Sequence, residues 1–174
     1  NIGSEVAKIA RSLQMNVMVY DPYLSLERIE SLDAEKSSLD EVLKFSDFVS
    51  LHLPIMNSTK NIIDSKKIKL MKKTSYLINA ARGGLINEDD LYIALSKKNI
   101  AGAALDVFEN EPLINSRLHS LDNIILTPHL GASTAEAQDA ASIQISNQIS
   151  EFLKNGSIIN SVNMSSISGS EKNY

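Results

Sequence analysis

Residues 75–107 read SYLINAARGGLINEDDLYIALSKKNIAGAALDV, and this stretch predicts the fold. It opens and closes with short apolar runs, 75–79 and 101–107, of the kind that forms buried strands. Between them, Asn87 and the three acids that follow it are typical of a helix N-terminus, where a side-chain oxygen caps free amides and negative charge meets the helix dipole. A strand, a helix and a second strand in this order indicate one unit of a parallel α/β sheet.

The same alternation continues on both sides of this stretch. Apolar runs predict three more strands, at 16–20, 48–53 and 123–127, which are ended by Pro22, Pro54 and Pro128. Helices are predicted at 4–15, from the capping box at 38–41, from Ser65 to about Met71, at 87–98 and at 133–155, the last opened by a capping box at 133–136 and closed by Gly156. Apolar residues fill the strands without alternation, as in strands covered on both faces. The sequence therefore predicts an α/β fold with a doubly wound parallel sheet.

Composition narrows the possible functions. The 174 residues include 17 basic and 21 acidic side chains of interspersed sign, which argues against a nucleic-acid surface. The lack of cysteine excludes a disulfide scaffold and thiolate chemistry and fits the cytoplasm, and no metal site is predicted. No apolar run reaches the ~18–20 residues of a spanning helix, so no membrane partner is expected. Three histidines remain as groups that titrate near neutral pH: His52, His119 and His129.

Asp21 is the first candidate at a strand end, where doubly wound sheets bind their ligands. It follows the strand at 16–20 and lies eighteen residues after Gly3. A dinucleotide-binding fold places a carboxylate there to hold the adenosine ribose, and Gly3 would be the third glycine of G-x-G-x-x-G. The alternative is an aspartate that only shapes the turn before Pro22. In the first case its charge predicts NAD rather than NADP, since Arg28 lies too far along to hold a 2′-phosphate.

Arg82 follows the strand at 75–79 and is flanked by small residues that leave room for a ligand. Its guanidinium is a fixed fork that can bind carboxylate or carbonyl oxygens through two parallel hydrogen bonds. The alternative is an arginine that pairs with a neighbouring surface acid. Gly83 and Gly84 favour the ligand, because glycines let the backbone approach another group closely.

Three further candidate residues lie at or after the ends of the last two predicted strands. Asp106 ends its strand, Glu111 lies in the loop after it, and His129 follows Pro128 before a helix N-terminus. His129 could be a helix-cap neighbour without a catalytic role, and the acids could be solvated loop charges. However, Arg82, Glu111 and His129 come from three consecutive strand–loop junctions, so a cation, an acid and an imidazole meet at one edge of one sheet. An imidazole beside a carboxylate is suited to taking a proton from an alcohol.

These motifs together resemble a known family. They are residues 1–3 with Asp21, 51–54 with Thr59, 79–84, 106–112 and 127–134, in an order and spacing that extend over nearly the whole chain to Asn163. In these stretches the sequence resembles the NAD-dependent D-isomer-specific 2-hydroxyacid dehydrogenases. Residues 131–138, together with 160–163, look most like the phosphoglycerate branch of that family.

The resemblance implies a Rossmann-like NAD-binding domain over residues 1–164. Its first strand and a separate substrate domain are expected to lie outside the chain, with the helix at 133–155 leading toward the substrate domain and residues 165–174 forming a disordered tail. By similarity, Arg82 holds the substrate carboxylate and carbonyl, His129 is the acid/base, and Glu111 pairs with His129 and favours its protonated form. The NAD site would be lined by Asn1, Ile2, Gly3, Asp21, His52, Pro54, Thr59, Ala80, Ala81, Arg82, Asp106, His129, Gly131 and Ala132, with His52 packing beside the cofactor and Asp106 facing the nicotinamide amide.

The function implied by the resemblance is hydride transfer between NAD and a D-2-hydroxy acid. Oxidation of 3-phosphoglycerate in serine synthesis is the leading interpretation. A reductase of glyoxylate, hydroxypyruvate or another 2-keto acid is an alternative, and so is an NAD-sensing, corepressor-like binding protein of the same fold. The resemblance also implies a homodimer or higher oligomer formed through the NAD-binding domain. The 174-residue chain alone is expected to be inactive, because the substrate domain that completes the site is missing. Substrate choice also resides mainly in that absent domain, so only residues 131–138 separate the candidate substrates.

Overall fold

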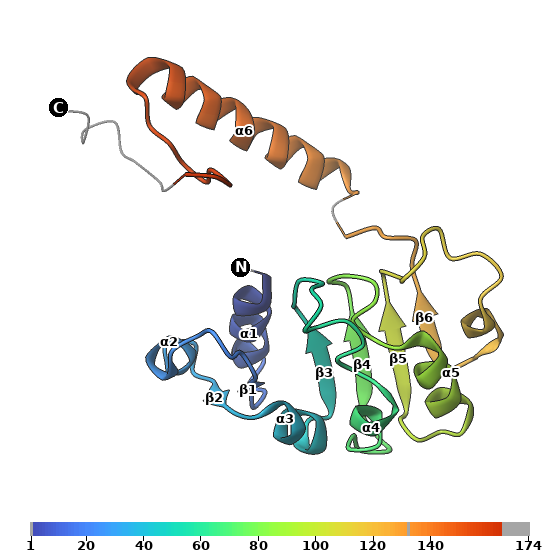
Figure 1. The fold of residues 1–174 in the computed structure, drawn as a ribbon. Coiled ribbons are helices and arrows are strands. Elements are labelled where there is room, and N and C mark those ends of the chain that lie inside the picture. Colours follow the sequence, from blue (N-terminus) through green and yellow to red (C-terminus); the bar gives the residue numbers. More distant parts are fainter. Residues whose placement is uncertain (1, 132, 165–174) are drawn as a thin grey trace. The chain divides into compact units, whose positions relative to one another are not determined.

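The computed structural model describes residues 2–131 and 133–164 (Figure 1). The predictions that place Asn1 and Ala132 in the NAD site, and the predicted tail at 165–174, lie outside the described residues. The chain divides into two compact units, Asn1–His129 and Leu130–Tyr174. Each unit is considered by itself.

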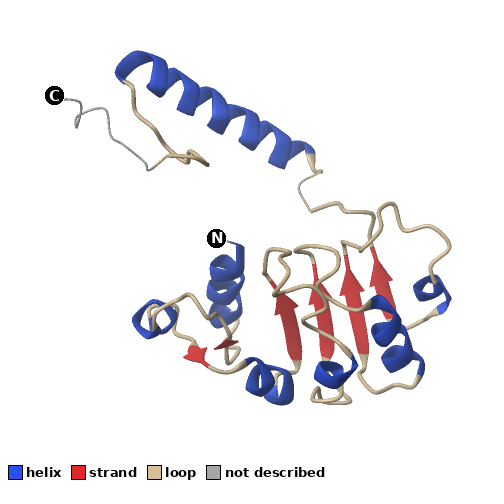
Figure 2. Cartoon of the chain, in the orientation of Figure 1, coloured by secondary structure: helices blue, strands red, loops and turns tan. Residues whose placement is uncertain are grey.

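The first unit contains parallel strands, as predicted. Four of them, β3 (Phe48–Leu51), β4 (Tyr76–Asn79), β5 (Gly102–Leu105) and β6 (Ile124–Leu126), form a sheet in the order β3-β4-β5-β6 (Figure 2). A second parallel pair joins β1 (Met18–Val19) to β2 (Glu35–Lys36). The strands are shorter than the apolar runs suggested, because only part of each run pairs with a neighbouring strand. The α/β fold with parallel strands is confirmed.

Helices precede, connect and follow these strands along the chain. They are α1 (Ile2–Ser12), α2 (Leu26–Glu30), α3 (Leu39–Phe45), α4 (Ser65–Ile68), α5 (Glu88–Ser96), the 3-10 turn η1 (Arg117–Ser120) and α6 (Ala135–Asn155). The short elements α2, β2 and η1 were not predicted, since five residues or fewer give too little periodicity to recognise. η1 contains His119, which is exposed.

Two of the predicted helix N-caps are confirmed, and two are displaced by one residue. Ser38 forms the expected capping box with Glu41, and Asn87 accepts the Asp90 N–H. α4 is capped by Asp64, not by Ser65, because the Asp64 carboxylate accepts two first-turn amides. α6 is capped by Thr134 rather than Ser133: the Thr134 hydroxyl accepts the Ala137 N–H. The capping box predicted at 133–136 is therefore wrong.

One face of the four-stranded sheet packs against helices to form the hydrophobic core. Its inward side chains pack against apolar residues of α3, α4, α5 and η1: Val49, Leu51, Leu77, Ala103, Leu105, Leu43, Ile68, Leu91, Leu95 and Leu118 are all buried. Burial of this kind contributes roughly 25 cal/mol for each Å² of apolar surface removed from water. The core thus fixes the strands whose ends carry the candidate residues.

The opposite face departs from the prediction of strands covered on both sides. Burial alternates along β3 and β4, and the outward residues Phe48, Tyr76 and Ile125 are 56%, 44% and 67% exposed. The Phe48 and Tyr76 rings stack with centroids 5.5 Å apart. The apolar face expected for the first helix is likewise mostly exposed, with only Ala7 buried in α1. Sequence cannot separate such outward apolar residues from inward ones when both are large and apolar.

The strand register aligns the carboxyl ends of the sheet. Leu51, Asn79, Leu105 and Leu126 are partners across the four strands. The residues that follow them, His52, Ala80, Asp106 and Thr127, therefore lie along one edge. All three loops expected to carry chemistry leave from this edge.

The second unit consists mainly of α6. Gly156 ends the helix as predicted, with a left-handed φ of 72° and its N–H donated to the Phe152 carbonyl at 2.8 Å. Among the described residues, no helix is long and apolar enough to cross a membrane.

Candidate active site

His129 and Glu111 form a pair at the carboxyl end of the sheet. His129 Nδ1 lies 2.7 Å from Glu111 Oε2, and the other carboxylate oxygen accepts the Phe108 N–H at 3.0 Å. The hydrogen bond with His129 lowers the pKa of Glu111, and the Phe108 N–H adds to this effect. Glu111 is thus a carboxylate at neutral pH and accepts only. Nδ1 therefore carries the hydrogen of this bond, which leaves Nε2 for other chemistry.

The backbone at His129 adopts an uncommon conformation. His129 has a φ of 56°, in the left-handed region that residues other than glycine seldom adopt, and its N–H donates to the Thr127 carbonyl at 3.0 Å. Thr127 in turn donates its hydroxyl to Asp106 Oδ1 at 2.6 Å, which ties the end of β6 to the end of β5. Backbone strain of this kind is concentrated at functional sites. The turn after β6 is therefore held from two sides.

Arg82 lies on the loop after β4 and is exposed. Its Nη1 donates to the Ala81 carbonyl at 2.6 Å, and in the part of the chain that the structure describes it forms no ion pair with an acid. Asn79, only 2% exposed, holds this loop: its amide donates to the Arg82 carbonyl at 2.9 Å and its oxygen accepts the Ala81 N–H at 3.1 Å. The alternative of a surface ion pair is thus not supported, and the guanidinium is available to an anion.

Gly83 brings the Arg82 loop against the Glu111 loop. A Cβ on Gly83 would lie 1.8 Å from the Phe108 carbonyl oxygen and 2.9 Å from the Glu109 nitrogen. No side chain fits in such a gap, so the two backbones touch at this point. The structure therefore brings the loops of Arg82, Glu111 and His129 together, as the sequence predicts.

Asp21 follows β1 at the place expected for a ribose-binding carboxylate. Its Oδ1 accepts the N–H groups of Tyr23 and Leu24 at 2.8 and 3.1 Å, so the residue does shape a turn. Within residues 2–131 and 133–164, Oδ2 makes no hydrogen bond. The two interpretations of Asp21 are therefore compatible, because one oxygen fixes the turn and the other is open to a hydroxyl.

Gly3 and His52 are two further residues predicted to line the NAD site, and they lie close together. A Cβ on Gly3 would lie 3.1 Å from His52 Cβ, so α1 approaches the end of β3 as closely as the third glycine of the dinucleotide fingerprint requires. The His52 ring contacts Ser50 Oγ through Nε2 at 3.0 Å, and burial lowers the pKa of His52. The packing role predicted for His52 fits this geometry. Gly3, His52 and Asp21 are compatible with a bound dinucleotide.

Some predicted residues are held by other contacts. Thr59 is buried, and its hydroxyl donates to the Pro54 carbonyl at 2.7 Å and accepts the Met56 N–H at 2.8 Å, so it shapes the loop after β3. Gly131 belongs to the second unit, and its position relative to the first is not described. Asn79 and Thr127 were missed as individual site residues, although both lie inside the motifs that marked the site.

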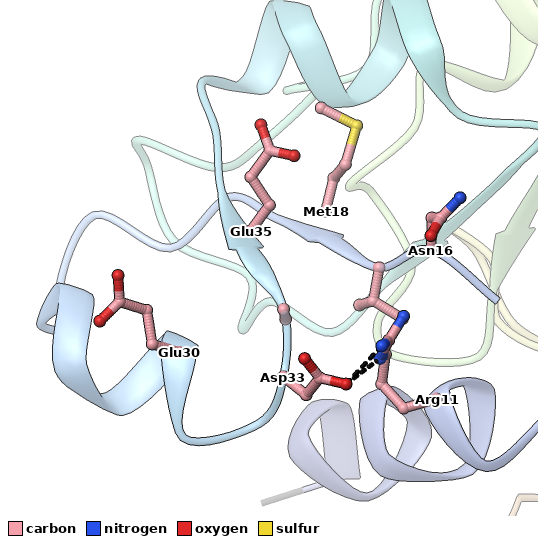
Figure 3. A pocket seen from close by; sticks show the side chains of 8 residues that line it. Arg11, Asn16, Met18, Glu30, Asp33 and Glu35 are labelled. Atoms are coloured by element: carbon pink, nitrogen blue, oxygen red, sulfur yellow. Dashed lines mark hydrogen bonds and ion pairs between the residues drawn. The ribbon is translucent and has the colours of Figure 1, made fainter. Parts of the chain in front are cut away.

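A hollow of about 400 Å³ lies away from these residues (Figure 3). It is lined by residues at the amino ends of β1 and β2, where Arg11 Nε donates to Asp33 Oδ2 at 2.8 Å. The candidate chemistry lies at the opposite, carboxyl ends of the strands. No group of three or more acids and histidines in the described ranges could hold a metal ion.

Comparison with known proteins defines the class. Residues 1–131 match the family described as D-isomer specific 2-hydroxyacid dehydrogenase, NAD binding domain. The chain is 46% identical over 167 residues to D-3-phosphoglycerate dehydrogenase of Methanocaldococcus jannaschii, covering 95% of this chain and 32% of that protein. The chain belongs to the D-isomer specific 2-hydroxyacid dehydrogenase family, and NAD is the cofactor of its domain.

Solved structures agree with this assignment. A glyoxylate reductase from Paecilomyes thermophila superposes with a TM-score of 0.81 at 34% identity, over 93% of this chain and 49% of that one. A D-lactate dehydrogenase from Aquifex aeolicus, complexed with NAD and lactic acid, gives 0.75 at 32% identity, over 89% and 51%. The chain thus spans about a third of the length of the phosphoglycerate dehydrogenase and about half of these solved chains.

Proposed function

We propose that the protein carrying this chain is an oxidoreductase that transfers a hydride between NAD and a D-2-hydroxy acid, with 3-phosphoglycerate as the substrate. The observation that carries the proposal is the 2.7 Å contact between His129 Nδ1 and Glu111 Oε2, next to the loop of an arginine without an acidic partner in the described chain. A proton-transfer group and an anion-binding group at one sheet edge are what oxidation of a hydroxy acid needs.

His129 moves the proton. Oxidation of a secondary alcohol removes a hydride from carbon and a proton from oxygen, and bound NAD supplies the hydride acceptor. Nε2 of His129 takes the hydroxyl proton, because Nδ1 is occupied by Glu111. The negative Glu111 stabilises the imidazolium that forms, and in the reverse reaction the imidazolium returns the proton to the carbonyl oxygen.

Arg82 holds the substrate. Its guanidinium can bind the carboxylate through two hydrogen bonds and polarise the oxygen that becomes the carbonyl. Asn79 fixes the carbonyl of Arg82 and the amide of Ala81, so the loop presents the side chain from a fixed position. This preorganisation supports orientation of the reacting carbon.

The cofactor would be held by residues at the carboxyl end of β1 and along the carboxyl edge of the four-stranded sheet. Asp21 would accept hydrogen bonds from the adenosine ribose hydroxyls through the oxygen not used by its turn. The first turn of α1, which Gly3 brings close to His52, would hold the pyrophosphate. Ala80, Ala81 and Asp106 would line the nicotinamide end. The negative charge of Asp21 would disfavour the 2′-phosphate of NADP.

The choice of 3-phosphoglycerate is supported by the 46% identity to D-3-phosphoglycerate dehydrogenase of Methanocaldococcus jannaschii. The sequence of residues 131–138, which resembles the phosphoglycerate branch, also supports it. This substrate would place the reaction in serine synthesis, and we propose that it takes place in the cytoplasm. The family resemblance supports a homodimer or higher oligomer formed through the NAD-binding domain. A second candidate is a glyoxylate or hydroxypyruvate reductase, which the 0.81 TM-score to a glyoxylate reductase favours.

A substrate panel on the full-length protein tests the proposal. We expect NAD-dependent oxidation of 3-phosphoglycerate with a kcat/KM about tenfold or more above that for glycerate, since a bound phosphate adds charge-assisted hydrogen bonds. NADH-dependent reduction of phosphohydroxypyruvate should exceed reduction of glyoxylate and hydroxypyruvate in the same way. Preference for glyoxylate would favour the second candidate, and no turnover of any member of the panel would contradict the class of reaction.

A further inference from the structure

The loop that carries Glu111 is held by a hydrogen bond to α5, a helix that takes no part in the proposed chemistry. Glu88, the first residue of α5, accepts the Glu109 backbone N–H through Oε1 at 2.7 Å, across 21 positions of sequence. Glu109 is two residues before Glu111. The contact therefore joins the start of α5 to the loop in front of the acid/base pair.

The hydrogen bonds continue from this anchor to the imidazole. Phe108, next to Glu109, donates its N–H to Glu111 Oε1 at 3.0 Å, and Glu111 Oε2 contacts His129 Nδ1 at 2.7 Å. Phe108 also rests with its carbonyl against Gly83, which fixes the loop from the Arg82 side. A displacement of Glu109 would therefore move the amide that holds Glu111.

Resting on the function proposed above, we infer that Glu88 is a positioning residue, whose carboxylate oxygen holds residues 108–109 so that Glu111 orients His129. Burial raises the pKa of Glu88, and the hydrogen bond from the Glu109 N–H acts in the opposite direction; the neighbouring charges of Glu109 and Asp89 also raise this pKa. The Glu109 N–H, 2.7 Å from Glu88 Oε1, offsets part of this desolvation.

A second anchor on the same loop is weaker. Lys60 Nζ lies 3.1 Å from Glu109 Oε1, but both side chains are exposed, at 58% and 43%. Exposed ion pairs contribute little, because water and salt screen them. Lys60 is therefore a suitable comparison for Glu88, since it contacts the same loop residue through the side chain and not the backbone.

The variants separate the acceptor oxygen from the charge. Glu88→Ala removes both, Glu88→Gln keeps an oxygen that can accept the Glu109 N–H, and Asp89→Ala removes a neighbouring first-turn charge from the same helix without touching the loop. Lys60→Ala removes the exposed ion pair. Circular dichroism and thermal unfolding of each variant show whether α5 and the fold are retained.

The first readout is hydrogen exchange of the Phe108 and Glu109 amides, measured by NMR together with the ring-nitrogen shifts of His129. We expect Glu88→Ala to exchange both amides about tenfold or more faster and to move the His129 shifts. Glu88→Gln, Asp89→Ala and Lys60→Ala should stay close to the wild type. Unchanged Phe108 exchange and unchanged His129 shifts in Glu88→Ala would overturn the inference.

The second readout is turnover of the full-length protein. Glu88→Ala should lower kcat about tenfold or more while the KM for NAD changes little, because misplacement of a catalytic group affects the chemical step. Rescue by Glu88→Gln is the expected result, and equal loss in Glu88→Gln and Glu88→Ala would contradict the role of the acceptor oxygen. If the exchange data follow the expectation but the wild-type protein turns over no hydroxy acid, the proposed function fails while the positioning role stands.

Discussion

At the scale of single residues, the site depends on carboxylates whose two oxygens bind different groups. Glu111 accepts a backbone amide with one oxygen and contacts His129 with the other, so the chain fixes the carboxylate before any substrate binds. Asp21 divides its oxygens in the same manner between a turn and, as proposed, a ribose. Preorganised groups of this kind stabilise developing charge without reorganising during the reaction.

Asp21 carries a prediction about cofactor choice. Asp21→Asn should keep the turn, because its amide oxygen can still accept the Tyr23 and Leu24 amides, but it removes the charge that repels a 2′-phosphate. We expect NAD to bind about tenfold more weakly, in line with loss of charge-assisted hydrogen bonds, and discrimination against NADP to decrease. Titration of the full-length protein with NADH and NADPH, followed by fluorescence, measures both affinities.

Asp21→Ala is the matched comparison, since it loses the turn as well as the charge. If Asp21→Asn leaves both cofactor affinities as in the wild type, Asp21 does not bind the ribose. In that case the turn would be its whole role.

At the scale of elements, contact between two loops matters more than either loop alone. Gly83→Ala would place a Cβ 1.8 Å from the Phe108 carbonyl oxygen, so the Arg82 and Glu111 loops must separate. We expect a loss of about 1–3 kcal/mol in the free energy of unfolding, typical of overpacking, together with a clear loss of turnover. Urea unfolding of the chain and initial rates of the full-length protein test these effects.

Gly84→Ala serves as the control for this prediction. Gly84 needs its left-handed φ of 78°, but a Cβ there meets only the end of the Ile55 side chain at 3.4 Å. Its replacement should cost about 1–2 kcal/mol through the backbone and leave the contact between the loops in place. Wild-type stability and turnover in Gly83→Ala would show that the loops need not touch.

The elements also show what sequence could predict. The apolar runs and caps indicated the parallel strands and the main helices, because these patterns depend on local chemistry: Ser38, Asn87 and Gly156 act as expected. Cap positions at Asp64 and Thr134 were missed by one residue, since neighbouring polar residues cap equally well. The exposure of Phe48 and Tyr76 could not be predicted, because it depends on what covers the sheet and not on the strand itself.

For the site, the sequence indicated the residues that carry chemical groups and missed those that hold them. Arg82, Glu111 and His129 have recognisable chemistry and follow strands in order. Asn79, Thr127 and Glu88 act through hydrogen bonds to backbone or to another side chain, some of them across more than twenty positions. Such contacts become visible only when the register places the strand ends side by side.

At the scale of the whole molecule, a parallel sheet concentrates chemistry at one edge. The register of the four strands brings the loops after β3, β4, β5 and β6 to that edge. The hydrophobic core fixes the positions of the strands. The chain spans only part of the length of its relatives, and the proposed reaction belongs to the full-length protein. In that protein, we propose that the proton passes through His129.

The most direct test of this account is the initial rate of NADH formation from 3-phosphoglycerate by the full-length protein and its His129→Ala variant. We predict a fall of about 10²- to 10⁴-fold to the background rate, the range expected for loss of a general acid/base, with the affinity for NAD retained. His119→Ala, which changes an exposed histidine of η1, should keep the wild-type rate. A His129→Ala rate equal to the wild type would contradict the assignment of His129 as the group that moves the proton.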